Sequence, residues 1–119
     1  MVKYILVVDD ELDMRDYLRI LLEDKGYVVK TASDGVEALA IIKEDRPALV
    51  LLDLLMPAET GTGLYRKLHD HKELRDIPVV VVSGQAGRNV AVGRNVVVLD
   101  KPIVEDRVLA EVERVLGPA

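Results

Sequence analysis

Five short runs of apolar or β-branched residues recur along the chain, and their order constrains the fold more than any other feature of the sequence. Four of them are continuously apolar, at residues 4–8, 49–52, 79–82 and 96–99, and the fifth is a β-branched segment at residues 27–31. Runs of four or five aliphatic and β-branched residues are typical of strands in a parallel sheet that is covered on both faces. We therefore expect five short strands that are distributed along the whole chain.

The segments between most of these runs have the spacing of amphipathic helices. Helices are expected at 12–25, from Asp34-Gly35 to about Glu44, around 63–71, and between Pro102 and Gly117. Strands that alternate with helices indicate an α/β, doubly wound fold, with a five-stranded parallel sheet and helices on both faces. The chain has 119 residues, the size of one domain, so we expect a single domain over residues 1–119.

Residues 84–95 depart from this pattern at the place where the fourth crossover helix should lie. Glycine and valine are frequent there, and both disfavour a helix. The segment also begins a six-residue repeat, because Gly87–Val92 and Gly93–Val98 differ at one position, Ala91 against Val97. Two copies are too few for a solenoid, and chance or a small duplication explains them. We expect a short or irregular fourth crossover.

The composition disfavours several classes of function. Without cysteine, the chain can form no disulfide, thiolate zinc site or cysteine nucleophile. Its 16 basic and 21 acidic residues give a formal net charge of −5, which argues against direct nucleic acid binding. His69 and His71 lie in a charged stretch and make a poor metal site. No apolar run approaches the roughly 18 residues of a membrane span, so we expect a cytoplasmic protein without membrane insertion.

Polar residues follow four of the five runs, at the point where each strand should end. Asp9 and Asp10 follow the first run, Asp53 the third and Ser83 the fourth, and Lys101 comes just after the fifth. The carboxyl ends of the strands form the ligand sites of open α/β sheets, so these side chains should converge at one edge. Three carboxylates, a hydroxyl and an ammonium group suit a Mg²⁺ ion and a phosphoryl group.

Each of these residues also has a purely structural interpretation when it is taken alone. Asp9 and Asp10 could cap the first helix, where a carboxylate favours the positive end of the helix dipole. Asp53 could begin a turn, Ser83 could be a strand-end hydroxyl, and Lys101 could be a solvated side chain. Their positions at the ends of different strands favour a shared functional site.

The ordered set of motifs resembles the receiver domain of two-component response regulators over essentially the whole chain. The matching features are Asp9-Asp10 after the first strand, Asp53 after the third, Met56-Pro57 with Gly61 eight residues beyond Asp53, Ser83 ending the fourth strand, and Lys101-Pro102 after the fifth. Each motif is weak alone, but their order and spacing are specific. The resemblance implies the flavodoxin-like strand order 2-1-3-4-5 and a phosphoprotein of signal transduction.

The resemblance also implies a mechanism. Asp53 would be the nucleophile that accepts a phosphoryl group from a histidine kinase or a phosphotransfer protein. Lys101 would pair with one phosphoryl oxygen, and Ser83 would donate a hydrogen bond to another. The domain would catalyse its own phosphorylation and dephosphorylation and would not be a turnover enzyme.

Mg²⁺ is the cofactor that the resemblance implies. Asp10, Asp53 and the backbone carbonyl of Leu55 would bind the ion, and Asp9 would act directly or through a water molecule. The charges of the metal and of the Lys101 ammonium group would then lie where negative charge develops during phosphoryl transfer.

The sequence departs from the family at positions that usually transmit the signal. Most receivers carry an aromatic residue three positions before the lysine, where this chain has Val98, and a valine cannot swing a ring between buried and exposed positions. Gly84 replaces the usual alanine, and the crossover from Ser83 to Lys101 is shorter than usual by about one helical turn. We expect intact chemistry with an unusual output to a downstream protein target.

The sequence leaves alternatives open for how partners are recognised and for what the domain does. The exposed side of the first helix, with Asp13, Arg15, Asp16 and Arg19, is either a kinase-docking face or a solvated surface. The oligomeric state is left open, and a homodimer is one alternative. A phosphorylation-independent pseudo-receiver, acting as a protein-interaction module, is the main alternative function. A Mg²⁺-dependent hydrolase is disfavoured because Leu55 stands where its second aspartate would be. A nucleotide-binding domain is disfavoured because no glycine-rich phosphate motif follows the first strand.

Overall fold

The chain folds as alternating strands and helices. The computed structural model describes residues 3–53, 60–83, 97–100 and 102–118. The strands are β1 (Tyr4–Val8), β2 (Val28–Ala32), β3 (Leu49–Asp53), β4 (Val79–Ser83) and β5 (Val97–Asp100). The helices are α1 (Leu12–Asp24), α2 (Gly35–Glu44), α3 (Thr60–Asp70) and α4 (Glu105–Leu116).

The strands form a parallel sheet in the order β2-β1-β3-β4-β5. β1 lies between β2 and β3, and β3 pairs with β4 so that Asp53 is opposite Val82. β4 pairs in turn with β5, where Ser83 is opposite Asp100. The expected α/β fold with a parallel sheet is confirmed for β2-β1-β3-β4. The irregular crossover expected at 84–95 lies outside the described residues.

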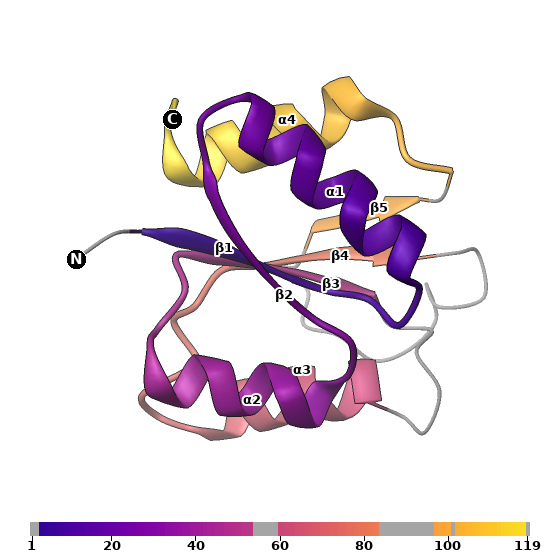
Figure 1. Cartoon of the computed structure of the whole chain (residues 1–119). Coiled ribbons are helices and arrows are strands. Elements are labelled where there is room, and N and C mark those ends of the chain that lie inside the picture. Colours follow the sequence, from indigo (N-terminus) through magenta and orange to yellow (C-terminus); the bar gives the residue numbers. More distant parts are fainter. Residues whose placement is uncertain (1–2, 54–59, 84–96, 101, 119) are drawn as a thin grey trace.

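Helices cover both faces of the sheet. Figure 1 shows α1 and α4 on one face and α2 and α3 on the other. All the strand pairs are parallel, so the carboxyl ends of the strands lie together at one end of the sheet. Among the helices in the described residues, none combines the length and apolar character that crossing a bilayer requires.

Side chains of β1 alternate between two hydrophobic cores. Tyr4, Leu6 and Val8 belong to the α2–α3 core, which includes buried side chains of those two helices. Ile5 and Val7 belong to the α1–α4 core on the other face. Side chains of β3 and β4 alternate in the same way. The α2–α3 core contains Val50, Leu52 and Val81. The α1–α4 core contains Leu49, Leu51, Val80 and Val82. Because both faces are covered, nearly every strand position must be apolar, which explains the continuous runs.

A reciprocal pair of hydrogen bonds fixes the start of α2. Asp34 Oδ1 accepts a hydrogen bond from the Glu37 N–H at 2.8 Å. Glu37 Oε1 in turn accepts one from the Ser33 N–H at 2.6 Å. The first bond satisfies an amide group that the first turn of a helix leaves without a helical partner. The second ties Ser33, the residue before the Asp34 cap, to that turn, so the Asp34-Gly35 motif marks the start of this helix.

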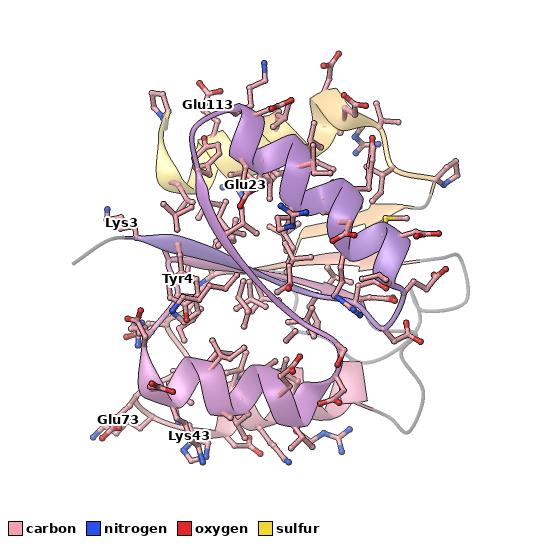
Figure 2. All side chains as sticks on the ribbon, viewed as in Figure 1. Lys3, Tyr4, Glu23, Lys43, Glu73 and Glu113 are labelled. Atoms are coloured by element: carbon pink, nitrogen blue, oxygen red, sulfur yellow. The ribbon has the colours of Figure 1, made fainter. Side chains whose placement is uncertain are left out.

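Tyr4, at the start of β1, fixes the amino end of the sheet (Figure 2). Its hydroxyl donates a hydrogen bond to the Asp45 carbonyl oxygen after α2, and Lys30 Nζ lies 4.4 Å from the ring centroid. Lys30 Nζ also lies 3.4 Å from Asp45 Oδ2. Burial raises the pKa of Tyr4 to about 12, and the Asp45 carboxylate adds to this shift. These contacts stabilise the amino end of the sheet, which is opposite the end where Asp9 and Asp53 lie.

Candidate functional site

Three carboxylates meet at the carboxyl edge of the sheet. Asp9 follows β1 directly, Asp10 comes next in the loop to α1, and Asp53 is the last residue of β3. One carboxylate oxygen from each residue lies within 4.8 Å of the others. Asp9 is 1% exposed and Asp53 is 3% exposed, whereas Asp10 is open to solvent. The structure thus brings together the three aspartates that the sequence placed at strand ends.

Asp9 is held through its backbone and its side chain. Its N–H donates a hydrogen bond to the Ala32 carbonyl oxygen at 3.1 Å, at the end of β2. Its Oδ1 accepts a hydrogen bond from the Glu11 N–H at 2.9 Å, just before α1 begins. Its carbonyl oxygen accepts a hydrogen bond from Arg15 Nη1 at 2.8 Å. Asp9 therefore stabilises the start of α1 and also belongs to the acidic cluster. The helix-start interpretation is thus compatible with the predicted role of Asp9 in metal binding.

Of the other site residues that the sequence predicts, one is placed by its strand and two lie outside the described residues. Ser83 ends β4, the strand that pairs with β3 next to Asp53. Lys101 follows β5 but lies outside the described residues, as does Leu55. The register of β4 and β5 brings the ends of these strands to the same edge as the aspartates.

The donor set determines what the cluster can bind. Carboxylate oxygens are the preferred ligands of Mg²⁺, which takes about six oxygens near 2.1 Å and usually keeps several waters. Two of the carboxylates are buried, and like charges this close repel one another in a poorly solvated environment. A divalent cation would relieve that repulsion. The exposed position of Asp10 leaves one side of the cluster accessible from solvent.

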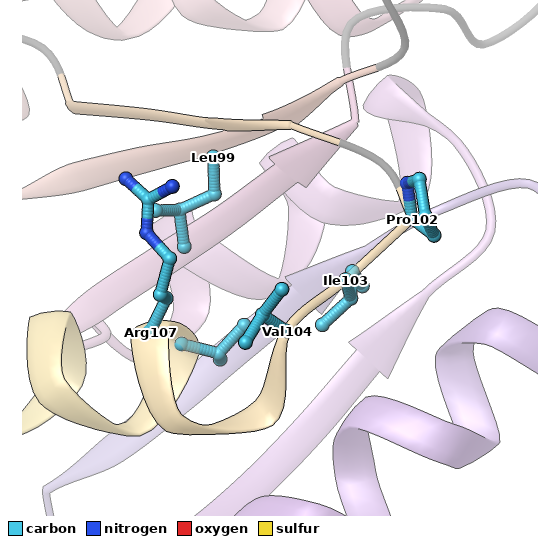
Figure 3. A pocket seen from close by; sticks show the side chains of 6 residues that line it. Leu99, Pro102, Ile103, Val104 and Arg107 are labelled. Atoms are coloured by element: carbon cyan, nitrogen blue, oxygen red, sulfur yellow. The ribbon is translucent and has the colours of Figure 1, made fainter.

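A small apolar pocket lies between β5 and the start of α4 (Figure 3). Its volume is about 80 Å³, and its lining residues are Leu99, Pro102, Ile103, Val104, Arg107 and Val108. None of these residues is acidic, and none belongs to the cluster of Asp9, Asp10 and Asp53. The pocket is therefore separate from the carboxylates, although it borders the segment that follows Lys101.

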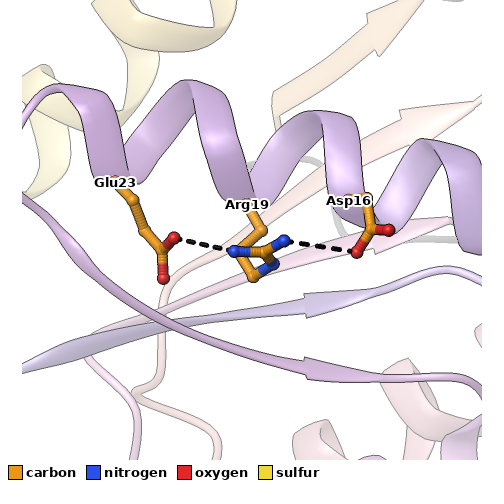
Figure 4. Close-up of polar contacts among 3 residues, drawn as sticks. All are labelled: Asp16, Arg19 and Glu23. Atoms are coloured by element: carbon orange, nitrogen blue, oxygen red, sulfur yellow. Dashed lines mark hydrogen bonds and ion pairs between the residues drawn. The ribbon is translucent and has the colours of Figure 1, made fainter.

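The surface of α1 differs from the expected docking face at one residue. Arg19 lies between two acidic side chains, with Nη2 at 3.5 Å from Asp16 Oδ1 and Nη1 at 2.9 Å from Glu23 Oε1 (Figure 4). Arg15 was expected on the same exposed face. It is partly exposed, as Asp16 and Arg19 are, but its guanidinium group donates a hydrogen bond to the Asp9 carbonyl oxygen. Arg15 therefore belongs to the surroundings of the acidic cluster.

Sequence reasoning missed two contacts of α1. One is the bond from Arg15 to Asp9; the only signal for it is a basic residue in the first turn after the acidic pair. The other joins α1 to α4, where the Tyr17 hydroxyl donates a hydrogen bond to Glu105 Oε2 at 2.9 Å. Its partners are 88 positions apart, and no local pattern relates them.

A family model and several known proteins match the sequence of this chain. A family model described as the response regulator receiver domain matches residues 5–113. The polar-differentiation response regulator DivK of Brucella anthropi is 34% identical over 124 residues, which cover 100% of both chains. The response regulator MprA of Mycobacterium ulcerans is 42% identical over 81 residues, which are 68% of this chain and 34% of MprA. The chain thus matches about a third of that longer relative.

A solved structure extends the similarity to three dimensions. The receiver domain of NtrX from Brucella abortus has a TM-score of 0.84 and 36% identity, and the match covers 97% of this chain and 99% of that one. The similarity includes the strands at whose ends Asp9 and Asp53 lie.

Proposed function

The chain belongs to the response regulator receiver domain family, and from that premise we propose that it is a phosphoacceptor whose acceptor residue is Asp53. The position of Asp53 carries this proposal. Asp53 is 3% exposed at the carboxyl end of β3, and a carboxylate oxygen of Asp9 and one of Asp10 lie within 4.8 Å of its own. A carboxylate fixed by a rigid strand presents one oxygen as a nucleophile in a defined direction.

In the proposed reaction, a carboxylate oxygen of Asp53 forms a bond to the phosphorus atom of a phosphohistidine. The bond from phosphorus to the histidine nitrogen breaks, and the nitrogen keeps the electron pair. The product is a mixed anhydride of the Asp53 carboxylate and phosphate. The proposed role of Lys101 is to pair with a phosphoryl oxygen, and that of Ser83 is to donate a hydrogen bond to another. The end of β4 beside β3 supports the role of Ser83.

The residues present fit Mg²⁺, on which receiver domains typically depend. Asp9, Asp10 and Asp53 would hold the ion, together with the backbone carbonyl of Leu55 that the family resemblance implies. When bound, the ion would supply positive charge at the acceptor and at the phosphoryl oxygens. The chemistry of the donor set, three convergent carboxylates of which one faces solvent, supports this assignment.

The proposed phosphoryl donor is a histidine kinase or a phosphotransfer protein, and the proposed target is a downstream protein. Such a donor would place the reaction in the cytoplasm. The proposal also includes a single receiver domain over residues 1–119 with the full strand order 2-1-3-4-5, which the pairing of β5 with β4 supports. A phosphorylation-independent interaction module is not favoured, because such a module would gain nothing from three converging carboxylates.

Intact-mass spectrometry after incubation with acetyl phosphate and Mg²⁺ tests the proposal. We expect one phosphoryl adduct that requires Mg²⁺, is absent from Asp53→Asn and persists in Asp76→Asn, which removes an exposed carboxylate before β4. An adduct retained by folded Asp53→Asn would assign another acceptor. A folded wild-type protein that binds Mg²⁺ but accepts no phosphoryl group from acetyl phosphate or from phosphorylated histidine kinases would favour the interaction module.

A further inference from the structure

The short loop between β1 and α1 carries two of the three clustered carboxylates. The geometry of the cluster therefore depends on what holds residues 9–11. The Asp9 N–H is fixed by Ala32 and its Oδ1 by the Glu11 N–H, at 3.1 Å and 2.9 Å. The backbone carbonyl oxygen of Asp9 accepts the hydrogen bond from Arg15 at 2.8 Å.

The bond from Arg15 acts on the peptide group that joins Asp9 to Asp10. This group is planar, so a hydrogen bond to its oxygen restricts the rotation of the whole unit. The orientation of this peptide group determines the position of the Asp10 Cα atom, and hence the position from which the Asp10 side chain extends. The donor is a charged guanidinium group at 2.8 Å, and charge-assisted hydrogen bonds are stronger than neutral ones. Its backbone lies in the first turn of α1, which gives the bond a rigid origin.

We propose that Arg15 is a positioning residue that holds the Asp9–Asp10 peptide so that the Asp10 carboxylate faces Asp9 and Asp53. This inference rests on the proposed function, because it assumes that the three carboxylates bind Mg²⁺. The position of the Asp10 carboxylate would then affect the affinity for the ion. Asp10 is the exposed member of the cluster, and its side chain is the one that solvent would otherwise leave free to turn. In this role Arg15 acts on the metal ligands through the backbone of Asp9.

A purely electrostatic role for Arg15 predicts the opposite sign of effect. A cation near three carboxylates repels a second cation, so its removal would strengthen Mg²⁺ binding. Positioning predicts weaker binding on removal, because groups that orient metal ligands typically change metal affinity by about 10- to 100-fold. The direction of the change therefore distinguishes the two roles.

Isothermal titration calorimetry with MgCl₂ on the full chain measures that direction. We expect Mg²⁺ binding about tenfold weaker in Arg15→Ala and partly restored in Arg15→Lys, which keeps a charged donor but replaces the planar guanidinium group with a single ammonium group. Arg19→Ala is the matched control, because it removes the same charge one turn further along α1, where the guanidinium group pairs with Asp16 and Glu23 (Figure 4). The affinity of this control should stay within about twofold of wild type. Unchanged or tighter binding in Arg15→Ala would overturn the proposal.

Amide hydrogen exchange in the metal-free protein gives a readout that does not depend on Mg²⁺. The Glu11 N–H donates to Asp9 Oδ1, so its exchange reports how firmly the loop is held. We expect faster exchange of the Glu11 amide in Arg15→Ala than in wild type or Arg19→Ala. Equal exchange rates in all three would refute the positioning role. Absence of Mg²⁺ binding by wild type would refute the metal site itself, and the exchange rates would still decide the role of Arg15 in the loop.

Discussion

Asp53→Asn should stabilise the protein when Mg²⁺ is absent. Two unit charges 4.8 Å apart repel by about 3.5 kcal/mol at an effective dielectric constant of about 20, and by about 0.9 kcal/mol in bulk water. Asp53 faces two such charges, on Asp9 and Asp10, at this distance or closer. Asp53 is buried, which favours the larger value, while cationic groups such as Arg15 offset part of the repulsion. We expect a net gain of about 1–3 kcal/mol in the free energy of unfolding.

Urea unfolding followed by circular dichroism, in a buffer with a chelator, measures this gain. The control is Asp76→Asn, an exposed substitution before β4 that changes the net charge equally without entering the cluster. Added Mg²⁺ should stabilise wild type more than Asp53→Asn, because the variant has lost a carboxylate ligand. The difference in the free energy of unfolding between Asp53→Asn and wild type should therefore become smaller when Mg²⁺ is added. The reasoning would be refuted if Asp53→Asn were no more stable than wild type without Mg²⁺, or if Asp76→Asn gained as much.

Three further substitutions test the fold. The pKa of Tyr4 is raised from 10.0 to about 12, so its stabilising effect is complete below pH 10 and is lost as the pH rises towards 12. In alkaline unfolding, wild type should therefore lose up to about 3 kcal/mol relative to Tyr4→Phe as the pH rises from 10 past 12, and parallel curves would contradict this. Asp34→Ala should cost about 1 kcal/mol in thermal unfolding by removing the bond to the Glu37 N–H, and no change would show that α2 needs no cap. Leu51→Ala should cost about 2–5 kcal/mol in urea unfolding, since Leu51 is 1% exposed, and a cost well below this range would mean that the α1–α4 core is loosely packed.

The strands were the most predictable part of the molecule. β1 and β4 start where their apolar runs start, because burial on both faces requires a continuous run. Helix ends were less predictable where packing opposes propensity. α3 begins at Thr60, three residues before the predicted start, and so includes Gly61 as well as Gly63. Leu64 and Leu68 of α3 are buried in the α2–α3 core, and this packing stabilises a first turn that glycine alone would disfavour.

The candidate site was predictable as far as it depends on strand ends. Asp9 and Asp53 follow apolar runs, and parallel topology alone brings them to one edge. The partner of Arg15 was not predictable, because the direction of its guanidinium group depends on how α1 leaves the loop after Asp10. A helical period shows which face a residue occupies, but it does not show that a long side chain bends back to a backbone oxygen.

The division of the interior into two cores has a consequence for how such a protein can change over evolutionary time. The α2–α3 core and the α1–α4 core are separated by the sheet, and alternate residues of β1 supply each. A change of side-chain volume on one face can be compensated by neighbours on that face, while the other face keeps its packing. The two helical layers are thus free to diverge separately under selection for different partners. The aspartates at the strand ends would stay in register throughout, because they depend on the backbone that both layers share.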